Sequence, residues 1–234
     1  MTEDSARGLH VFDLDGTLLR SAATLEIARH LGRDEVGRDI EERWLAGKIT
    51  ATAFWETLLE ICNAASEADL EAAFLSGPWM AGIAETFADI RSRGERVIVI
   101  SQSPLFFVRG LERWGAHETY GSAVEIGRPV TDTATLLPEA KVEIAQEALA
   151  RWNLTPRECV AYGDSTSDVN LFEWLPNTVA VNASPVLEGL AAARYVGTDI
   201  REAYAVGRQL LSNAGAGGRG GQEGAQVPSG NRST

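Results

Sequence analysis

The sequence predicts an α/β protein with a doubly wound, mostly parallel, Rossmann-like sheet and an all-helical segment inserted after the first strand. Short apolar runs typical of strands alternate with helical patterns along most of the chain. Several of these runs are continuous rather than alternating, as expected for strands that are buried on both faces. The region from about 21 to 78 contains only helical periodicity.

The expected strands are five short apolar runs, at 10–12, 96–100, 122–126, 159–162 and 178–181. Four helical patterns separate the later runs, at 81–93, 104–114, 139–152 and 167–174. Gly94 and Gly115 follow the first two of these patterns and are expected to end them. Ligands of such a fold bind where loops leave the carboxyl ends of the strands.

The predicted domains follow from this pattern. Residues 1–20 and 79–211 form the core domain, and the helical insertion 21–78 forms a separate cap. Residues 212–234 are rich in Gly, Ser and Ala and have almost no bulky apolar side chain. Such a segment buries too little surface to offset its ordering entropy, so we expect a disordered tail.

The composition excludes some functions and cellular sites. The chain has 234 residues, 44% of them hydrophobic, and a net charge of −12. A chain this acidic repels phosphate at long range, so nucleic acid and anionic membranes are unexpected partners. Its two cysteines, Cys62 and Cys159, lack metal-binding or disulfide spacing, and no stretch resembles a signal peptide or membrane span. We therefore expect a cytoplasmic monomer or homodimer with reduced thiols.

The motif DLDGT follows the first strand. At a strand end, Asp13 and Asp15 point the same way, so both carboxylates face one small space. Like charges this close require a cation between them or a proton on one of them. Mg²⁺ would meet this need, leaving one carboxylate as a nucleophile and the other as an acid and base. A simple capping aspartate is the alternative, but the whole motif favours a reactive site.

Two further groups are candidates for binding phosphate. Ser101 ends the second strand, where its hydroxyl and the backbone amides of Gln102 and Ser103 could hold anionic oxygens, although Ser101 alone could simply cap a helix. Lys141 lies near a helix start, where the helix macrodipole disfavours a cation. A lysine that neutralises a phosphate and a carboxylate together would explain this position, whereas an exposed lysine is the simpler alternative.

The motif GDSTSD follows the fourth strand and supplies more carboxylates. Asp164 is expected to coordinate the cation, and Asp168, one turn further on, to hold Lys141 or a metal-bound water. Thr17, in the first motif, is likewise expected to support the residues that hold the metal ion, without binding the ion itself.

In combination and in this order, DLDGT, the strand-end serine, the lysine and GDSTSD resemble the haloacid dehalogenase (HAD) superfamily, and its phosphoserine-phosphatase-like branch in particular. The resemblance covers about residues 9–200. It implies that Asp13 attacks phosphorus to form an aspartyl phosphate and that Asp15 is the acid and base. It also implies that Mg²⁺ is held by Asp13, Asp164 and the backbone carbonyl of Asp15, and that Ser101 and Lys141 bind the phosphoryl oxygens. The helical insertion corresponds to the family's cap.

The resemblance is weaker in the cap. Ala22 stands where a phosphoserine phosphatase has the glutamate that reads the substrate, and Glu56 stands at or near the place of its arginine. Glu26, one turn beyond Ala22, could substitute. The usual Gly-Gly pair after the strand-end serine is Gln102-Ser103 here.

These differences predict hydrolysis of a small phosphomonoester other than phosphoserine, with a hydroxylated or cationic leaving group. A true phosphoserine phosphatase, a phosphomutase or phosphotransferase that uses the same aspartyl phosphate, and a non-catalytic binding protein remain alternatives. Five cap aromatics either line a substrate pocket or, as their helical spacing favours, form core: Trp44, Phe54, Trp55, Phe74 and Trp79.

Overall fold

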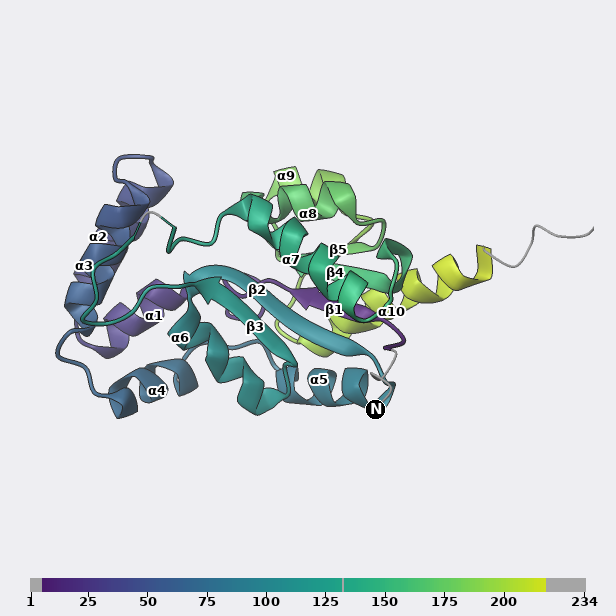
Figure 1. Ribbon diagram of the computed structural model, residues 1–234, viewed down its shortest axis with the longest axis horizontal. Coiled ribbons are helices and arrows are strands. Elements are labelled where there is room, and N and C mark those ends of the chain that lie inside the picture. The colour runs from purple at the N-terminus through teal and green to yellow at the C-terminus, as the bar shows by residue number, and fades with distance from the viewer. Residues whose placement is uncertain (1–5, 132, 218–234) are drawn as a thin grey trace, which may run out of the picture.

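A six-stranded sheet forms the centre of the molecule, which is described by a computed structural model for residues 6–131 and 133–217 (Figure 1). Its strand order is β3-β2-β1-β4-β5-β6, and all neighbouring strands are parallel. The strands are β1 (Leu9–Phe12), β2 (Arg96–Pro104), β3 (Glu118–Ser122), β4 (Cys159–Gly163), β5 (Thr178–Val181) and β6 (Ala193–Tyr195). The predicted α/β fold class is therefore confirmed.

Helices cover both faces of this sheet, as Figure 1 shows. One face carries α5 (Ile83–Ser92), α6 (Leu105–Val108) and α10 (Ile200–Gly217), and the other α7 (Pro138–Arg151), α8 (Val169–Trp174) and α9 (Pro185–Leu190). Short 3-10 turns span Arg109–Trp114, Pro156–Glu158 and Thr166–Asp168. Because side chains alternate along a strand, Val11 packs among residues of the second set of helices and Phe12 among those of the first.

The segment between β1 and β2 begins with four helices that form the cap. They are α1 (Ala23–His30), α2 (Asp34–Leu45), α3 (Ala51–Cys62) and α4 (Glu67–Leu75), and all lie within the predicted insertion 21–78. In Figure 1 they form the purple and blue group at one end of the sheet. Since α1 follows β1 closely, this is the end at which the parallel strands finish.

The order in which the strands are added creates a crevice at this end. The chain runs from β1 outward to β2 and β3, and then resumes on the other side of β1 with β4, β5 and β6. The connections after β1 and β4 therefore diverge to opposite sides. Such a switch point opens a crevice at the carboxyl ends of the strands, which is where open α/β sheets bind ligands.

Several predicted elements need correction. The third strand is Glu118–Ser122, not 122–126, because the residues after Ser122 leave the sheet and the Ala123 N–H bonds the Ala134 carbonyl at 2.7 Å. The strand β6 and the helices α9 and α10 are not predicted. The helix α10 continues to Gly217, past the expected start of the tail at 212, and residues 218–234 lie outside the described residues.

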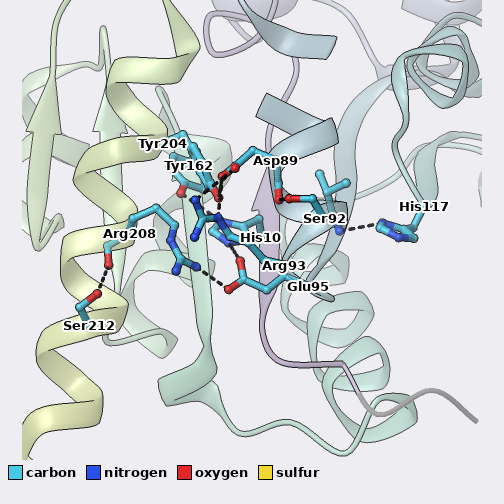
Figure 2. A network of polar contacts seen from close by, with 11 residues as sticks. His10, Asp89, Ser92, Arg93, Glu95, His117, Tyr162, Tyr204, Arg208 and Ser212 are labelled. Atoms are coloured by element: carbon cyan, nitrogen blue, oxygen red, sulfur yellow. Dashed lines mark hydrogen bonds and ion pairs between the residues drawn. The ribbon is translucent and has the colours of Figure 1, made fainter. Parts of the chain in front are cut away.

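A buried polar network fixes α10 to the sheet at the end opposite the crevice (Figure 2). His10 on β1 contacts the Glu95 carboxylate through Nε2 at 2.9 Å and the Tyr162 hydroxyl through Nδ1 at 3.1 Å. Arg208 of α10 forms an ion pair with Glu95, and Tyr204 donates to Asp89 of α5 at 2.7 Å. Every buried polar group named here is partnered, so the network stabilises the core without a ligand.

Two further observations concern cysteines and membranes. Cys62 and Cys159 are both buried free cysteines. Among the helices of residues 6–131 and 133–217, none has both the length and the apolar character needed to cross a bilayer.

Candidate active site

The DLDGT turn is anchored to three neighbouring elements. The Asp13 N–H donates to the Tyr162 carbonyl of β4 at 2.9 Å, which continues the pairing of β1 with β4. Asp15 accepts from the backbone N–H of Ala23, at the start of α1, at 2.8 Å. Its other oxygen accepts from the Ser103 hydroxyl of β2 at 2.5 Å. Both carboxylates are thus positioned at the crevice by contacts with the sheet and the cap.

Gly16 allows the two acidic motifs to meet. Its φ of +77° lies in the left-handed region, which glycine adopts without a steric cost. A Cβ atom at this position would lie 2.0 Å from Oδ2 of Asp164 and 2.4 Å from its Cγ. The close approach of Asp164 to the first motif therefore requires a glycine here.

Three carboxylates converge beside this turn. Single oxygen atoms of Asp13, Asp164 and Asp168 all lie within 4.8 Å of one another. Oδ1 of Asp164 is buried and has no hydrogen-bond partner among the described residues. A buried carboxylate oxygen without a partner is costly, and a hard cation is the ligand that such oxygens bind. The donor set therefore fits a divalent metal ion.

Lys141 is the basic group of this cluster. It is 1% exposed, and its Nζ donates to Asp13 Oδ1 and Asp168 Oδ1, each at 2.7 Å, and to the Ser167 hydroxyl at 3.2 Å. Burial lowers the pKa of Lys141, but the attraction of Asp13 and Asp168 outweighs burial and raises it above its ordinary value. Lys141 is therefore a charged lysine held between two carboxylates, and Asp168 contacts it directly, one of the two arrangements expected.

The ionised forms of the Asp13 and Asp164 carboxylates are destabilised by burial and by neighbouring negative charges. Burial raises the pKa of Asp13 well above its ordinary value, and although Lys141 opposes this, Asp168 and Asp164 add to it. Burial, with a further contribution from Asp168, raises the pKa of Asp164 to about 7. Added positive charge at this point would favour the ionised forms of both groups.

The phosphate-binding candidates lie at the end of β2. Ser101 is 1% exposed, and its hydroxyl oxygen accepts from the Ser103 N–H at 3.0 Å. The side chain of Gln102 donates to the Leu136 carbonyl at 3.1 Å. Thr17 is fully buried and its hydroxyl has no hydrogen-bond partner among the described residues, so it is not bonded to the acidic cluster.

A cavity of about 360 Å³ lies between this cluster and the cap. Asp13, Asp15 and Asp164 line it from the core, together with Ser101 and Gln102. The cap contributes five larger side chains, namely Glu41, Trp44, Leu45, Phe54 and Trp55. The Trp55 indole N–H donates to the Thr135 hydroxyl at 2.8 Å, which joins the cap to the core loop at the cavity wall.

The two predicted cap residues are not brought to the cavity. Glu26 pairs with Arg29 at 2.8 Å, Glu56 is exposed on α3, and neither lines the cavity. Glu41 takes this place instead. Sequence reasoning missed it, although its position three residues before Trp44 puts both on one face of α2. The sequence pattern also does not indicate the Ser103 hydroxyl, which donates to Asp15, because it points only to the backbone N–H of this residue.

The cap aromatics divide into two groups. Trp44, Phe54 and Trp55 line the cavity, although Phe54 and Trp55 are also almost fully buried. Phe74 and Trp79 pack instead against Phe107, with ring centroids 5.3 and 6.1 Å from it, and form core.

Comparison with known proteins decides the family. The model of the haloacid dehalogenase-like hydrolase family matches residues 10–173. The chain belongs to this family. It is 25% identical over 191 residues to a phosphoserine phosphatase of Idiomarina loihiensis, covering 79% of this chain and 86% of that protein. It is 24% identical over 204 residues to a phosphoserine phosphatase of Methanocaldococcus jannaschii, covering 85% of this chain and 97% of that protein.

A solved structure supports the same assignment. A phospho-aspartyl intermediate analogue of phosphoserine phosphatase matches this HAD protein with a TM-score of 0.69 and 25% identity, over 84% of this chain and 97% of that one. The predicted membership of the HAD superfamily, in its phosphoserine-phosphatase-like branch, is therefore confirmed, as is the expectation of a HAD-type phosphatase.

Proposed function

We propose that this HAD protein hydrolyses a small-molecule phosphomonoester with Mg²⁺ through an aspartyl phosphate on Asp13. The observation that carries the proposal is the convergence of Asp13 and Asp164, whose oxygens lie within 4.8 Å while Oδ1 of Asp164 has no hydrogen-bond partner among the described residues. Asp13, Asp164 and the backbone carbonyl of Asp15 would hold Mg²⁺, which when bound neutralises charge on the phosphoryl oxygens.

The reaction proceeds in two steps. An Asp13 oxygen attacks phosphorus, the phosphorus–oxygen bond of the ester breaks, and Asp15 donates its proton to the departing alkoxide. Asp15 then takes a proton from water, whose oxygen attacks phosphorus and displaces the Asp13 carboxylate, releasing inorganic phosphate. The bonds from Ser103 and Ala23 hold Asp15 in place for both proton transfers.

The remaining site residues stabilise charge on the transferring group. Lys141 is a fixed cation 2.7 Å from Asp13, where it offsets the charge of the nucleophile and of the phosphoryl oxygens, and Asp168 holds it there. Ser101 and Gln102 line the cavity together with Asp13, and the Ser101 hydroxyl and the Gln102 backbone N–H would bind phosphoryl oxygens. The cap excludes water from the cavity during the transfer.

The proposed substrate differs from phosphoserine. None of the described side chains that line the cavity belongs to lysine, arginine or histidine. The carboxylate of phosphoserine would therefore lack a basic partner and would share the cavity with Glu41. Ala22 lines the cavity at the place where the resemblance implies a substrate-reading glutamate, and its methyl group cannot bind the amino group of serine.

The test is hydrolysis of a chromogenic aryl phosphate with and without Mg²⁺, by the parent protein and by Asp13→Asn. We expect Mg²⁺-dependent phosphate release by the parent and almost none by the variant, which keeps the shape but removes the nucleophilic charge. Substantial activity of Asp13→Asn would overturn the assigned role. In a panel of phosphomonoesters, a strong and exclusive preference for phosphoserine would overturn the substrate assignment.

We further propose that the enzyme works in the cytoplasm, as a monomer or homodimer, on free small molecules rather than on nucleic acid. Its net charge of −12 and its two buried free thiols support this setting. Light scattering of the purified protein measures its oligomeric state.

A further inference from the structure

Glu41 is the charged group of the cavity that phosphoryl transfer does not use. Among the described residues, four charged side chains line the cavity, and all are acidic: Asp13, Asp15, Glu41 and Asp164. The three aspartates serve as nucleophile, proton carrier and metal ligand. Glu41 lies on the cap, and its hydrogen bond comes from the Thr24 hydroxyl. Within the described residues no basic side chain pairs with it.

An unpaired carboxylate in this position is costly. Burial raises the pKa of Glu41, and the Thr24 hydroxyl, which donates to it, opposes that change only in part. Thr24 is 3% exposed, so its hydroxyl holds one oxygen of Glu41 in a fixed position. A positive charge in the cavity would favour the ionised form and relieve the cost.

Three aromatic side chains, Trp44, Phe54 and Trp55, line the same cavity as Glu41. The centroids of Trp44 and Phe54 lie 5.6 Å apart, and those of Phe54 and Trp55 lie 4.8 Å apart with nearly perpendicular planes. The bond from Trp55 to Thr135 fixes one indole of this group. Aromatic rings attract cations through their negative faces, and grouped rings are a known way to bind ammonium groups.

We infer that the leaving group of the substrate carries a positive charge, so that the substrate is the phosphomonoester of a small amino alcohol. Glu41 and the rings of Trp44, Phe54 and Trp55 bind its ammonium group while its phosphate lies at Asp13. This inference rests on the proposed function and specifies its substrate class. An uncharged polyol phosphate would leave Glu41 without a counter-charge, and an amino-acid phosphate would add a carboxylate that no described side chain of the cavity neutralises.

A pair of substrates that differ only in charge tests this inference. Phosphocholine carries a quaternary ammonium, and 3,3-dimethylbutyl phosphate is its uncharged analogue of nearly the same shape. We expect kcat/KM to be about tenfold or more higher for phosphocholine, as an ion pair and aromatic contacts in a partly desolvated site would give. The kcat/KM for phosphoethanolamine should likewise be higher than that for phosphoserine, which differs from it by one added carboxylate.

The Glu41→Gln variant connects this preference to its residue. The ratio of kcat/KM values for the charged and uncharged substrates should fall toward one in Glu41→Gln. The matched control is Glu42→Gln, an exposed neighbour on α2 that does not line the cavity, which should keep the parental ratio. Because the comparison within the parent protein needs no variant, poor folding of Glu41→Gln would not leave the inference untested.

The outcomes separate this inference from the proposed function. Mg²⁺-dependent hydrolysis of the aryl phosphate with equal kcat/KM for the two matched substrates would overturn the inference and leave the phosphatase assignment in place. A higher kcat/KM for phosphoserine than for phosphoethanolamine would also overturn it. Failure to hydrolyse any of these phosphates would overturn the proposed function, and the inference with it.

Discussion

Gly16 and Asp164 approach so closely that a Cβ atom on Gly16 would lie 2.0 Å from the Asp164 carboxylate. One residue belongs to the turn after β1 and the other to the loop after β4, which are separated by almost 150 positions in the chain. Their contact places Asp164 beside Asp13 and so creates the acidic cluster. The geometry of the acidic cluster therefore depends on a residue that carries no side chain.

The Gly16→Ala variant should lose activity out of proportion to its loss of stability. The added methyl group must push Asp164 away from Asp13, and a displacement of about 1 Å can cost about 100-fold in rate. Gly127→Ala is the matched control, because Gly127 has a φ of +75° but open space around it. We expect both variants to lose stability from the left-handed backbone, and Gly16→Ala also from the clash with Asp164, but a large loss of kcat/KM only in Gly16→Ala. Equal activities would show that the close approach is unimportant.

The Lys141→Met variant should be strongly destabilised. It would leave Asp13 and Asp168 buried without the cation that lies 2.7 Å from each, and breaking a buried ion pair in this way typically costs about 3–5 kcal/mol. Urea unfolding in the presence of a chelator measures this cost without compensation by metal ions. Lys48→Met, at the exposed other lysine, should change the free energy of unfolding by less than about 0.5 kcal/mol. A small effect of Lys141→Met would mean that the carboxylates are neutral in the folded protein.

The Ser103→Ala variant should lower kcat. Without the hydroxyl, the Asp15 carboxylate loses one of the two hydrogen bonds that it accepts from described residues, and it is less well placed for proton transfer. We expect kcat to fall about tenfold, the equivalent of one hydrogen bond to a charged group, and Ser103→Thr, which keeps a hydroxyl, to recover most of it. Ser92→Ala, at the exposed end of α5, controls for loss of a serine hydroxyl. If Ser103→Ala retains the parental kcat, Asp15 does not depend on this bond.

How well the sequence predicts each strand of this protein depends on how deeply that strand is buried. The strands β1, β4 and β5 have neighbours on both sides and helices on both faces, so they are buried throughout, mostly apolar and easily recognised. The edge strand β3 (Glu118–Ser122) is mostly half-exposed and polar, and β6 has only three residues, so neither has a clear apolar pattern. A continuous apolar pattern marks a strand that is buried on both faces, so it does not detect half-exposed edge strands.

Whether a site residue can be predicted from sequence depends on whether it follows a strand of the sheet or lies on a cap helix. Asp13, Asp15 and Asp164 follow strands, and parallel strands of one sheet bring their carboxyl ends together whatever the details of packing. Glu41 lies on a cap helix, and its place in the cavity depends on how α2 packs over the sheet. Local sequence does not specify that packing, so reasoning by position selected Glu26 and Glu56 instead.

His117 should make the protein less stable as the pH falls. Its Nδ1 accepts a hydrogen bond from the Val97 N–H at 3.0 Å, and burial together with Arg91 and Arg96 lowers the pKa of His117 to about 4. Because the unfolded chain binds this proton more readily, the contribution is complete above about pH 6.5 and is lost as the pH falls toward about 4.

The variant His117→Gln isolates this contribution. Between pH 6.5 and 4, the dependence of its unfolding free energy on pH should be weaker than that of the parent, by up to about one proton. His30→Gln, on the exposed end of α1, is the matched control. Parallel curves for the parent and His117→Gln would contradict the assignment of a neutral His117 in the folded protein.

The most direct measurement of the central claim is to locate the phosphoryl group on the enzyme during turnover. The protein would be mixed with a radiolabelled phosphomonoester and Mg²⁺, quenched in acid, and mapped by peptide mass spectrometry. We predict a label on the peptide that contains Asp13, dependent on Mg²⁺ and absent from Asp13→Asn. Turnover by the parent with the label on another residue, or turnover by Asp13→Asn at the parental rate, would contradict the account.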